Sequence, residues 1–384
     1  MRTLTMTKNN SRVLGTLLVA ALSGAPLWGQ STAPQTNFDN TGYGSTAAEF
    51  LLLGAGARGA ALGNGYSALA TDVTALYYNP GGLAGISRPQ AMVSTYNYVA
   101  GTKYTWLGLA LPISGGVRAI GVQLGNFGFS NQPVYTLDNP DGDGTTYSVS
   151  ETFLAATLSQ NFSDRFSAGL TLKFVTDQLG QTTANGVALD FGTNFHAMIG
   201  DRPIRAAFVI ENLGQNLQAS GAALETQVLR TPPLGTVQIP QDAQPANLRT
   251  SPWSMPVLFR VGLAYDLYSA GSNRVSLVGE FNQPTNTKPG GGMGLEYAMT
   301  NIGNSGFSLA ARGSYTLIPD NNIDPGSGAG FSTSQSTSTF SSQGVAFGGG
   351  LNYARGNFNL GFDYAYRNMG ALGGTNFLSF SLGW

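Results

Sequence analysis

The sequence contains no cysteine and few charged residues. Of its 384 residues, one is His and only 10% are Asp, Glu, Lys or Arg. The lack of cysteine excludes disulfides, thiolate metal sites and a cysteine nucleophile. So few charges cannot cover the surface of a soluble protein of this length. The formal net charge is -1 and there is no basic block, which argues against nucleic acid as a partner.

Long apolar runs are missing too, apart from one near the N-terminus. Arg2, Lys8 and Arg12 precede the apolar stretch 13–22, and small residues follow it. This pattern is typical of a secretory signal peptide, and the stretch is too short to cross a hydrocarbon layer of about 30 Å. We predict that residues 1–29 are a signal peptide cleaved near Gly29. The exported protein is then periplasmic, secreted or a β-barrel.

From Gln90 onward, the hydropathy of the sequence alternates with a period of two residues. Large apolar residues alternate with small or polar ones, as in 357–367 and 377–384. This is the pattern of strands with one apolar face. There are about fourteen such segments, an even number as bacterial barrels require, and many are long enough for a tilted strand that crosses a bilayer. They start near Gln90, Lys103, Val117, Tyr147, Arg165, Ala184, Pro203, Met255, Arg274, Gly291, Gly306, Gly344, Asn357 and Thr375.

The connections between these segments differ on the two sides. One set is tight, as at 114–116 and 270–272, whereas the alternate set includes the long polar stretches 130–146, 214–254 and 319–343. A soluble β-sandwich also shows a period of two, but it has no reason to keep its long loops on alternate connections. The sequence therefore predicts an all-β fold: a 14-stranded antiparallel transmembrane β-barrel over residues 90–384, in the cell outer membrane and surrounded by its lipid.

Residues 30–89 have a different pattern. Residues 47–53 form an apolar run, and Asp72 can cap a second short helix that ends at Leu76. Asn79 and Pro80 fit an N-cap followed by proline at the first helical position. The segment is too long for a bare tail, so we predict a plug with short helices inside the lumen. An ordered periplasmic extension is the alternative.

The same region carries a family resemblance. The stretch 50–65, FLLLGAGARGAALGNG, and the stretch 75–84, ALYYNPGGLA, resemble the N-terminus of the PorV/PorQ family. Residues 187–192, 210–214, 260–266, 294–297 and 361–366 extend the resemblance over nearly the whole exported chain. Tyr78 departs from the family, which often has Trp there. The family is similar to the FadL transporters, which implies a fourteen-stranded barrel with an N-terminal plug.

The resemblance also implies functions. The first is a PorV-like role in protein secretion or surface export, in which external loops bind a type IX translocon and secreted cargo. The alternative is FadL-like transport of hydrophobic small molecules, and a surface enzyme comes third. An apolar pocket between plug and wall would favour transport, whereas a filled lumen and a broad loop surface would favour a partner role.

The phase of the strands places charged residues in the lumen. Five basic and six acidic residues share this phase: Lys173, Asp190, Arg205, Glu211, Arg260, Asp266, Glu280, Glu296, Arg312, Asp363 and Arg367. A selective pore concentrates one sign of charge, whereas mixed signs beside plug residues such as Arg58 and Asp72 favour ion pairs between plug and wall. With Asn79 and Pro80, Arg58 and Asp72 make up the predicted plug motif.

Two motifs contain residue types that could carry chemistry. His196 is the single histidine and shares a face with Asp190, but no nucleophile elbow accompanies it, so we expect a hydrogen-bonded structural imidazole and no catalytic residue or cofactor. Asn139, Asp141 and Asp143 resemble the first half of a calcium loop, but the second half is missing. An external Asp and Gly turn is the alternative to a Ca²⁺ site.

The C-terminus ends in alternating large apolar residues. Phe380, Leu382 and Trp384 resemble the signal that barrel-insertion machinery recognises. A lipid-facing aromatic residue at the membrane boundary is an equally compatible interpretation.

Overall fold

The computed structural model describes residues 44–228, 243–317 and 344–384. The predicted signal peptide, residues 30–43 of the predicted plug, part of the predicted loop 214–254 and all of the predicted loop 319–343 lie outside these residues. The first seven strands of the sheet are β1 Gln90–Asn97, β2 Lys103–Ile113, β3 Arg118–Pro133, β4 Thr146–Ser163, β5 Phe166–Leu179, β6 Thr182–Ile199 and β7 Arg202–Gly214. The last seven are β11 Leu258–Ala270, β12 Asn273–Pro284, β13 Gly290–Met299, β14 Phe307–Leu317, β15 Val345–Arg355, β16 Phe358–Asn368 and β17 Gly374–Gly383.

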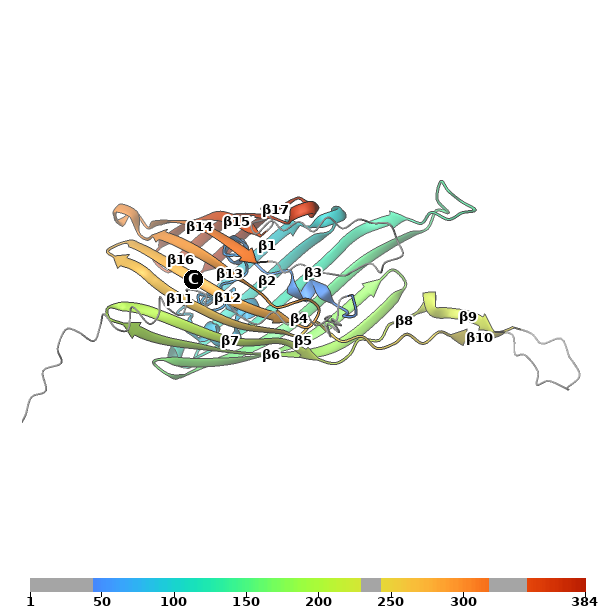
Figure 1. The fold of residues 1–384 in the computed structure, drawn as a ribbon, viewed down its shortest axis with the longest axis horizontal. Helices are drawn as coiled ribbons and strands as arrows, with labels where there is room; N and C mark the ends of the chain where they lie inside the picture. Colours follow the sequence, from blue (N-terminus) through green and yellow to red (C-terminus); the bar gives the residue numbers. More distant parts are fainter. Residues whose placement is uncertain (1–43, 229–242, 318–343) are drawn as a thin grey trace, which may run out of the picture. The chain divides into compact units, whose positions relative to one another are not determined.

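These strands form a closed sheet (Figure 1). Each pairs antiparallel with its neighbour along the chain, β7 pairs with β11, and β1 pairs with β17. Fourteen strands of the described chain therefore make the barrel, which confirms the prediction, and each begins within three residues of its expected position. We call the end with the long connections the loop end and the opposite end the turn end.

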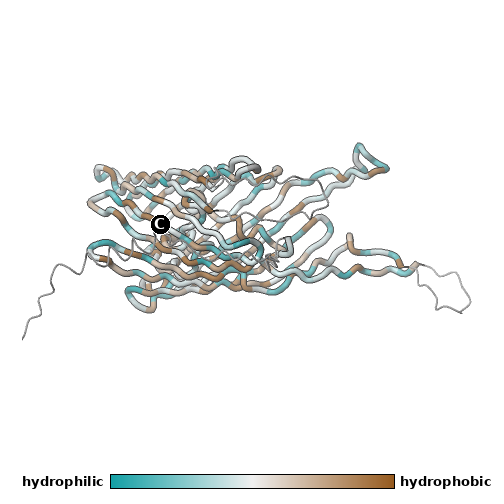
Figure 2. The backbone as a smooth tube through the Cα atoms, in the orientation of Figure 1, coloured by the Kyte–Doolittle hydropathy of each residue, from teal (hydrophilic) through white to brown (hydrophobic). Residues whose placement is uncertain are grey.

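The side chains on the outer face are apolar and uncovered. On β17, Leu378 and Phe380 are 38% and 56% exposed, whereas Ser379 between them is 1% exposed and points inward. The same alternation of apolar and polar residues runs along the other strands (Figure 2). Soluble proteins rarely expose apolar patches of this extent. A closed barrel with such an outer surface has the two properties that a hydrocarbon environment requires.

The connections at the loop end hold further elements. The predicted loop 214–254 contains β8 Ser220–Gly221, which pairs with β6, and a separate hairpin of β9 Glu225–Val228 and β10 Gln244–Asn247. Short 3-10 turns at this end are η3 Val99–Gly101, η5 Ala222–Leu224 and η7 Gly370–Leu372, and those at the turn end are η4 Ser114–Gly116 and η6 Ile302–Asn304. No helix in the described residues is long and apolar enough to span a membrane.

The segment before β1 lies inside the barrel and forms its core. It contains η1 Glu49–Leu52, α2 Ala57–Ala61, α3 Ala75–Tyr78 and η2 Pro80–Gly85. Helix α2 packs against β14–β17, and η2 packs against β3–β6. The expected helix over 47–53 is only one 3-10 turn. Asp72 was expected to cap a helix directly, but α3 begins at Ala75, and the Asp72 carboxylate instead accepts a hydrogen bond from the Thr74 amide at 2.9 Å.

The Asn79 turn docks the plug against the wall. The Asn79 Oδ1 atom accepts a hydrogen bond from the Gly81 amide at 3.0 Å, and Pro80 is the first residue of η2. The predicted N-cap is therefore present. The Asn79 Nδ2 atom donates to the Thr193 carbonyl of β6 at 3.1 Å. Ser167 of β5 donates to the Gly81 carbonyl at 2.7 Å. The Asn79 turn can lie this close to the wall only where the wall has no side chain. Gly192 is such a position, because a Cβ there would lie 2.4 Å from Asn79 Oδ1.

Gly192→Ala should therefore loosen the plug. The added methyl group displaces the Asn79 turn, and we expect a cost of about 1–3 kcal/mol in the free energy of unfolding, as for overpacked cores. Amide hydrogen exchange over residues 79–85 should accelerate. Gly279→Ala is the control, since its Cβ would meet nothing nearer than 3.9 Å. Equal exchange in the two variants would contradict this docking.

Phe380→Arg tests the outer face. A charged side chain at a lipid-facing position in the bilayer should destabilise the barrel by about 2–4 kcal/mol, whereas Phe380→Leu should have little effect. Urea unfolding in lipid vesicles measures the difference. If both variants were as stable as the parent chain, the face carrying Phe380 would not contact lipid.

Candidate functional site

A pocket of about 850 Å³ lies between the plug and the wall at the loop end. We call it the loop-end pocket. Turn η1 and Asn64 contribute its plug side, and residues of β1, β3–β6, β16 and β17, together with the connections at this end, complete it. Its aromatic lining residues are Phe50, Tyr96, Tyr98, Phe127, Trp253 and Phe377.

Packing and hydrogen bonds hold these aromatic side chains in place. The rings of Tyr96 and Phe377 lie 4.1 Å apart between centroids, and those of Tyr98 and Phe127 lie 6.0 Å apart. Tyr96 donates its hydroxyl to the Leu53 carbonyl at 3.1 Å, which ties the wall to the end of η1. An apolar pocket whose walls are fixed in this way is preorganised for a ligand.

Four charged residues line the loop-end pocket. They are Glu49 of the plug, Glu151 of β4, Asp177 of β5 and Arg367 of β16. Glu151 and Asp177 are directly opposite each other in the β4 and β5 pairing. Sequence reasoning identified Arg367 but missed these two acids. They share the inward phase of Lys173, so extending the alternation towards the loop end by a few residues would have found them.

A smaller cavity of about 230 Å³ lies on the turn-end side of the plug and is polar. Its charged lining residues are Arg58, Asp72, Arg312 and Asp363. The buried Glu296 organises the region: its Oε2 lies 2.9 Å from Arg58 Nε and 2.7 Å from Arg312 Nε, and its Oε1 lies 3.1 Å from Arg274 Nη2.

Arg58 is the plug's ionic link to the wall. It pairs with Glu296 and, at 2.9 Å, with Asp72 of the plug itself. Burial alone would lower the pKa of Arg58, but Glu296 and Asp72 hold it well above its usual value. Arg58 thus stays charged at any physiological pH.

Other predicted lumenal charges also form pairs. Lys173 lies 2.8 Å from Asp190, and Arg205 lies 3.2 Å from Asp266. Arg260 contacts Glu211 at 3.1 Å and Glu280 at 3.2 Å, and it donates to the plug carbonyl of Asn64 at 3.1 Å. Arg312 pairs with Asp363 at 2.5 Å. Of the eleven predicted residues, only Arg367 forms no ion pair within the described chain.

Within the described residues, His196 forms no ion pair with an acid. It lies opposite Arg205 in the β6 and β7 pairing, and Asp190 is taken by Lys173. The expectation of a hydrogen-bonded imidazole was wrong, because the His196 side chain forms no hydrogen bond within the described residues. The ring is only partly buried, so water can satisfy its nitrogens.

The calcium candidate forms a self-contained turn. Asp143 accepts hydrogen bonds from the Thr145 amide at 2.8 Å and the Thr145 hydroxyl at 2.6 Å, and these bonds lower its pKa. The Gly142 amide donates to the Asn139 carbonyl at 3.0 Å. In the part of the chain that the structure describes, no group of three His, Cys, Asp or Glu side chains could hold a metal ion.

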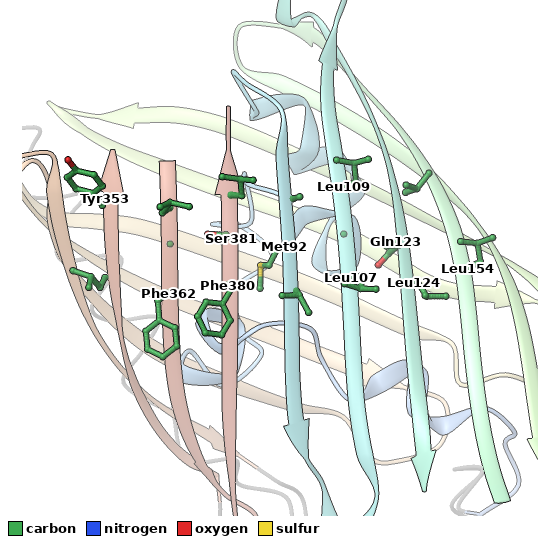
Figure 3. A pocket seen from close by; sticks show the side chains of 18 residues that line it. Met92, Leu107, Leu109, Gln123, Leu124, Leu154, Tyr353, Phe362, Phe380 and Ser381 are labelled. Carbon is green, nitrogen blue, oxygen red and sulfur yellow. The ribbon is translucent and has the colours of Figure 1, made fainter. Parts of the chain in front are cut away.

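A further hollow of about 800 Å³ lies on the outer face of β1–β3 and β15–β17 (Figure 3). Its lining is almost wholly apolar, and side chains such as Leu107, Leu124 and Phe380 belong to the outward phase of the strands. The hollow is therefore continuous with the lipid-facing surface. We expect lipid chains to fill it, and it is not the candidate ligand site.

The fold and its pocket define the chain as a plugged, fourteen-stranded antiparallel barrel. No protein-family model and no curated protein match its sequence. Similar solved structures include the Pseudomonas putida toluene transporter TodX, with 13% identity, a TM-score of 0.49, and coverage of 86% of this chain and 96% of TodX.

Two others are comparable. The Ralstonia pickettii toluene transporter TbuX has 11% identity and a TM-score of 0.49, with 87% of this chain and 98% of TbuX covered. A Pseudomonas aeruginosa FadL homologue has 12% identity and a TM-score of 0.44, with 85% and 97% covered. These likenesses do not identify what this chain binds. None concerns the PorV/PorQ family, so that resemblance stays a prediction.

Glu296→Ala should release the plug from the wall. It leaves three guanidinium groups without their shared carboxylate, and breaking buried pairs typically costs about 3–5 kcal/mol. Denaturant unfolding measures the loss, and Glu225→Ala on the exposed hairpin is the control. If the free energy of unfolding fell by only about 0.5 kcal/mol, as at ordinary surface sites, the plug would not depend on this network.

Proposed function

We propose that the chain is an outer-membrane transporter for small hydrophobic molecules. The observation that carries this proposal is the loop-end pocket, an aromatic-lined space between plug and wall. A lumen filled throughout would have no room for a ligand, and a water-filled pore would have no need of an aromatic site. Long connections face the outside in barrels of this kind, so the pocket faces the exterior, where a ligand arrives.

The exported chain reaches this membrane through its signal peptide and the C-terminal residues Phe380, Leu382 and Trp384. On the far side of the plug, the turn-end cavity is small and charged. A ligand that leaves the loop-end pocket for the periplasm must pass the plug, so the plug gates transport. The ion pairs of Arg58 and the docking of Asn79 set how readily it moves.

A PorV-like role in protein export is the second candidate. It is favoured by the hairpin of β9 and β10, which exposes apolar residues such as Val228 and Leu248 near the loop end. Such a hairpin suits a translocon or cargo contact. Deleting residues 222–248 distinguishes the two functions, because an export role requires the hairpin whereas the loop-end pocket does not contain it.

Ala184→Trp tests the transport function. Ala184 is buried, lines the loop-end pocket and points inward from β6, so an indole there fills the space that a ligand needs. We expect initial uptake of radiolabelled naphthalene by Gram-negative cells expressing the chain to fall about tenfold, the effect of losing ~1.4 kcal/mol of binding.

Leu189→Trp, on the outer face of the same strand, is the matched control and should transport normally. Both variants must reach the outer membrane in equal amounts. Unchanged uptake with Ala184→Trp would rule out the loop-end pocket as the transport site.

A further inference from the structure

The acidic residues of the loop-end pocket differ from those in the rest of the lumen in how they are paired. Elsewhere, the buried carboxylates Asp190, Glu211, Asp266, Glu280 and Glu296 each face a lysine or an arginine. In the pocket, Glu49, Glu151 and Asp177 form no ion pair within the described residues. Like charges directly opposite on neighbouring strands, as at Glu151 and Asp177, oppose folding. Three acids without a counter-charge therefore need an explanation other than stability.

Two buried acceptor atoms in the same pocket have no partner. Asp177 is 8% exposed and Asn286 is 4% exposed, and both line the pocket. The Oδ1 atom of each forms no hydrogen bond among the described residues. A buried acceptor without a donor costs about 1–3 kcal/mol. Each of these two Oδ1 atoms lacks a donor, which is what a ligand with N–H groups brings.

A bare metal ion does not fit this arrangement. No group of three acidic or histidine side chains in the described chain is arranged to hold one. The walls beside the acids are aromatic instead, and Phe50, Tyr96 and Phe377 line the same space. Aromatic faces attract organic cations and at the same time accept an apolar body.

Among the described residues that line the pocket, Arg367 is the single cationic side chain. It lies on β16, and four strands, β17, β1, β2 and β3, separate it from β4. It forms no ion pair with the three acids. The acids and Arg367 therefore make two separate polar positions. Three acids and the unpartnered Oδ1 of Asn286, against one guanidinium, favour a positively charged ligand.

We propose that the loop-end pocket selects amphipathic organic cations, in which an ammonium group with an apolar tail binds Glu151, Asp177 and Asn286 while the tail lies along the aromatic wall. This inference rests on the proposed transport function and names its substrate class. Glu49 of the plug, whose Oε2 accepts a hydrogen bond at 2.9 Å from Asn286 Nδ2 of the connection between β12 and β13, completes the acidic side. The ligand would thereby contact both plug and wall.

The test compares three ligands of one size but different charge. Octylammonium, octanol and octanoate are titrated calorimetrically into the full purified chain in a nonionic detergent at neutral pH, with empty micelles subtracted. We expect octylammonium to bind at least about tenfold more tightly than octanol, a difference of ~1.4 kcal/mol. The double variant Glu151→Gln and Asp177→Asn should lose that preference and still bind octanol.

Two controls sharpen the comparison. Glu225→Gln removes an acid outside the pocket, and Arg367→Gln removes the cation within it; neither should weaken octylammonium binding. Circular dichroism and migration of unheated samples on gels verify the fold of each variant. Because the acids repel each other, the double variant should be no less stable than the parent chain.

The outcomes separate this inference from the transport function. If octylammonium and octanol bind equally, or the double variant keeps the preference, cation selection is wrong, although octanol binding that Ala184→Trp abolishes would still support transport. Tighter binding of octanoate that depends on Arg367 would also overturn it in favour of an anionic ligand. If none of the three ligands binds, both proposals fail.

Discussion

Every backbone N–H and C=O group of a sheet in hydrocarbon must find its partner within the protein, because no water is there to replace it. The pairing of β1 with β17 meets this condition, since it removes the two edges that an open sheet would leave. Closure then fixes the direction of every side chain. On β17, Leu378 and Phe380 point outward, and the alternate residues point into a lumen. The plug, the ion pairs and the pocket are all consequences of how that lumen is filled.

A lumen lined by alternate residues of fourteen strands is too wide for side chains alone to fill. The plug fills it with two kinds of contact. At Gly192 and Gly169 the wall lacks side chains, so that the backbone around Pro80 can lie against β5 and β6. On the other side, Arg58 reaches Glu296, where the carboxylate also holds two arginines of the wall. Close backbone packing at the two glycines fixes the position of the plug. On the Arg58 side, ion pairs satisfy the buried polar groups.

Among the described residues, the plug leaves a pocket at the loop end, and the chemistry changes at that point. Within this part of the chain, the acids of the pocket lack the basic partners that acids elsewhere in the lumen have, and aromatic rings replace polar neighbours. This contrast is more informative than the fold, because barrels of one architecture can carry very different ligands. It favours transport over export, and it makes the charge of the ligand the property to measure.

The sequence by itself determined the barrel, because a period of two and the spacing of turns are local properties that each strand carries alone. It also determined the Asn79 and Pro80 cap and which face Phe380 and Asp363 would take. Only the tertiary structure decided which charges meet. Glu296 and Arg58 are 238 residues apart, and phase places both inside without saying that they touch. The same holds for the pocket: Glu151, Asp177 and Asn286 come from three separate segments, and whether a buried acid finds a partner depends on barrel closure and plug position, which no local pattern encodes.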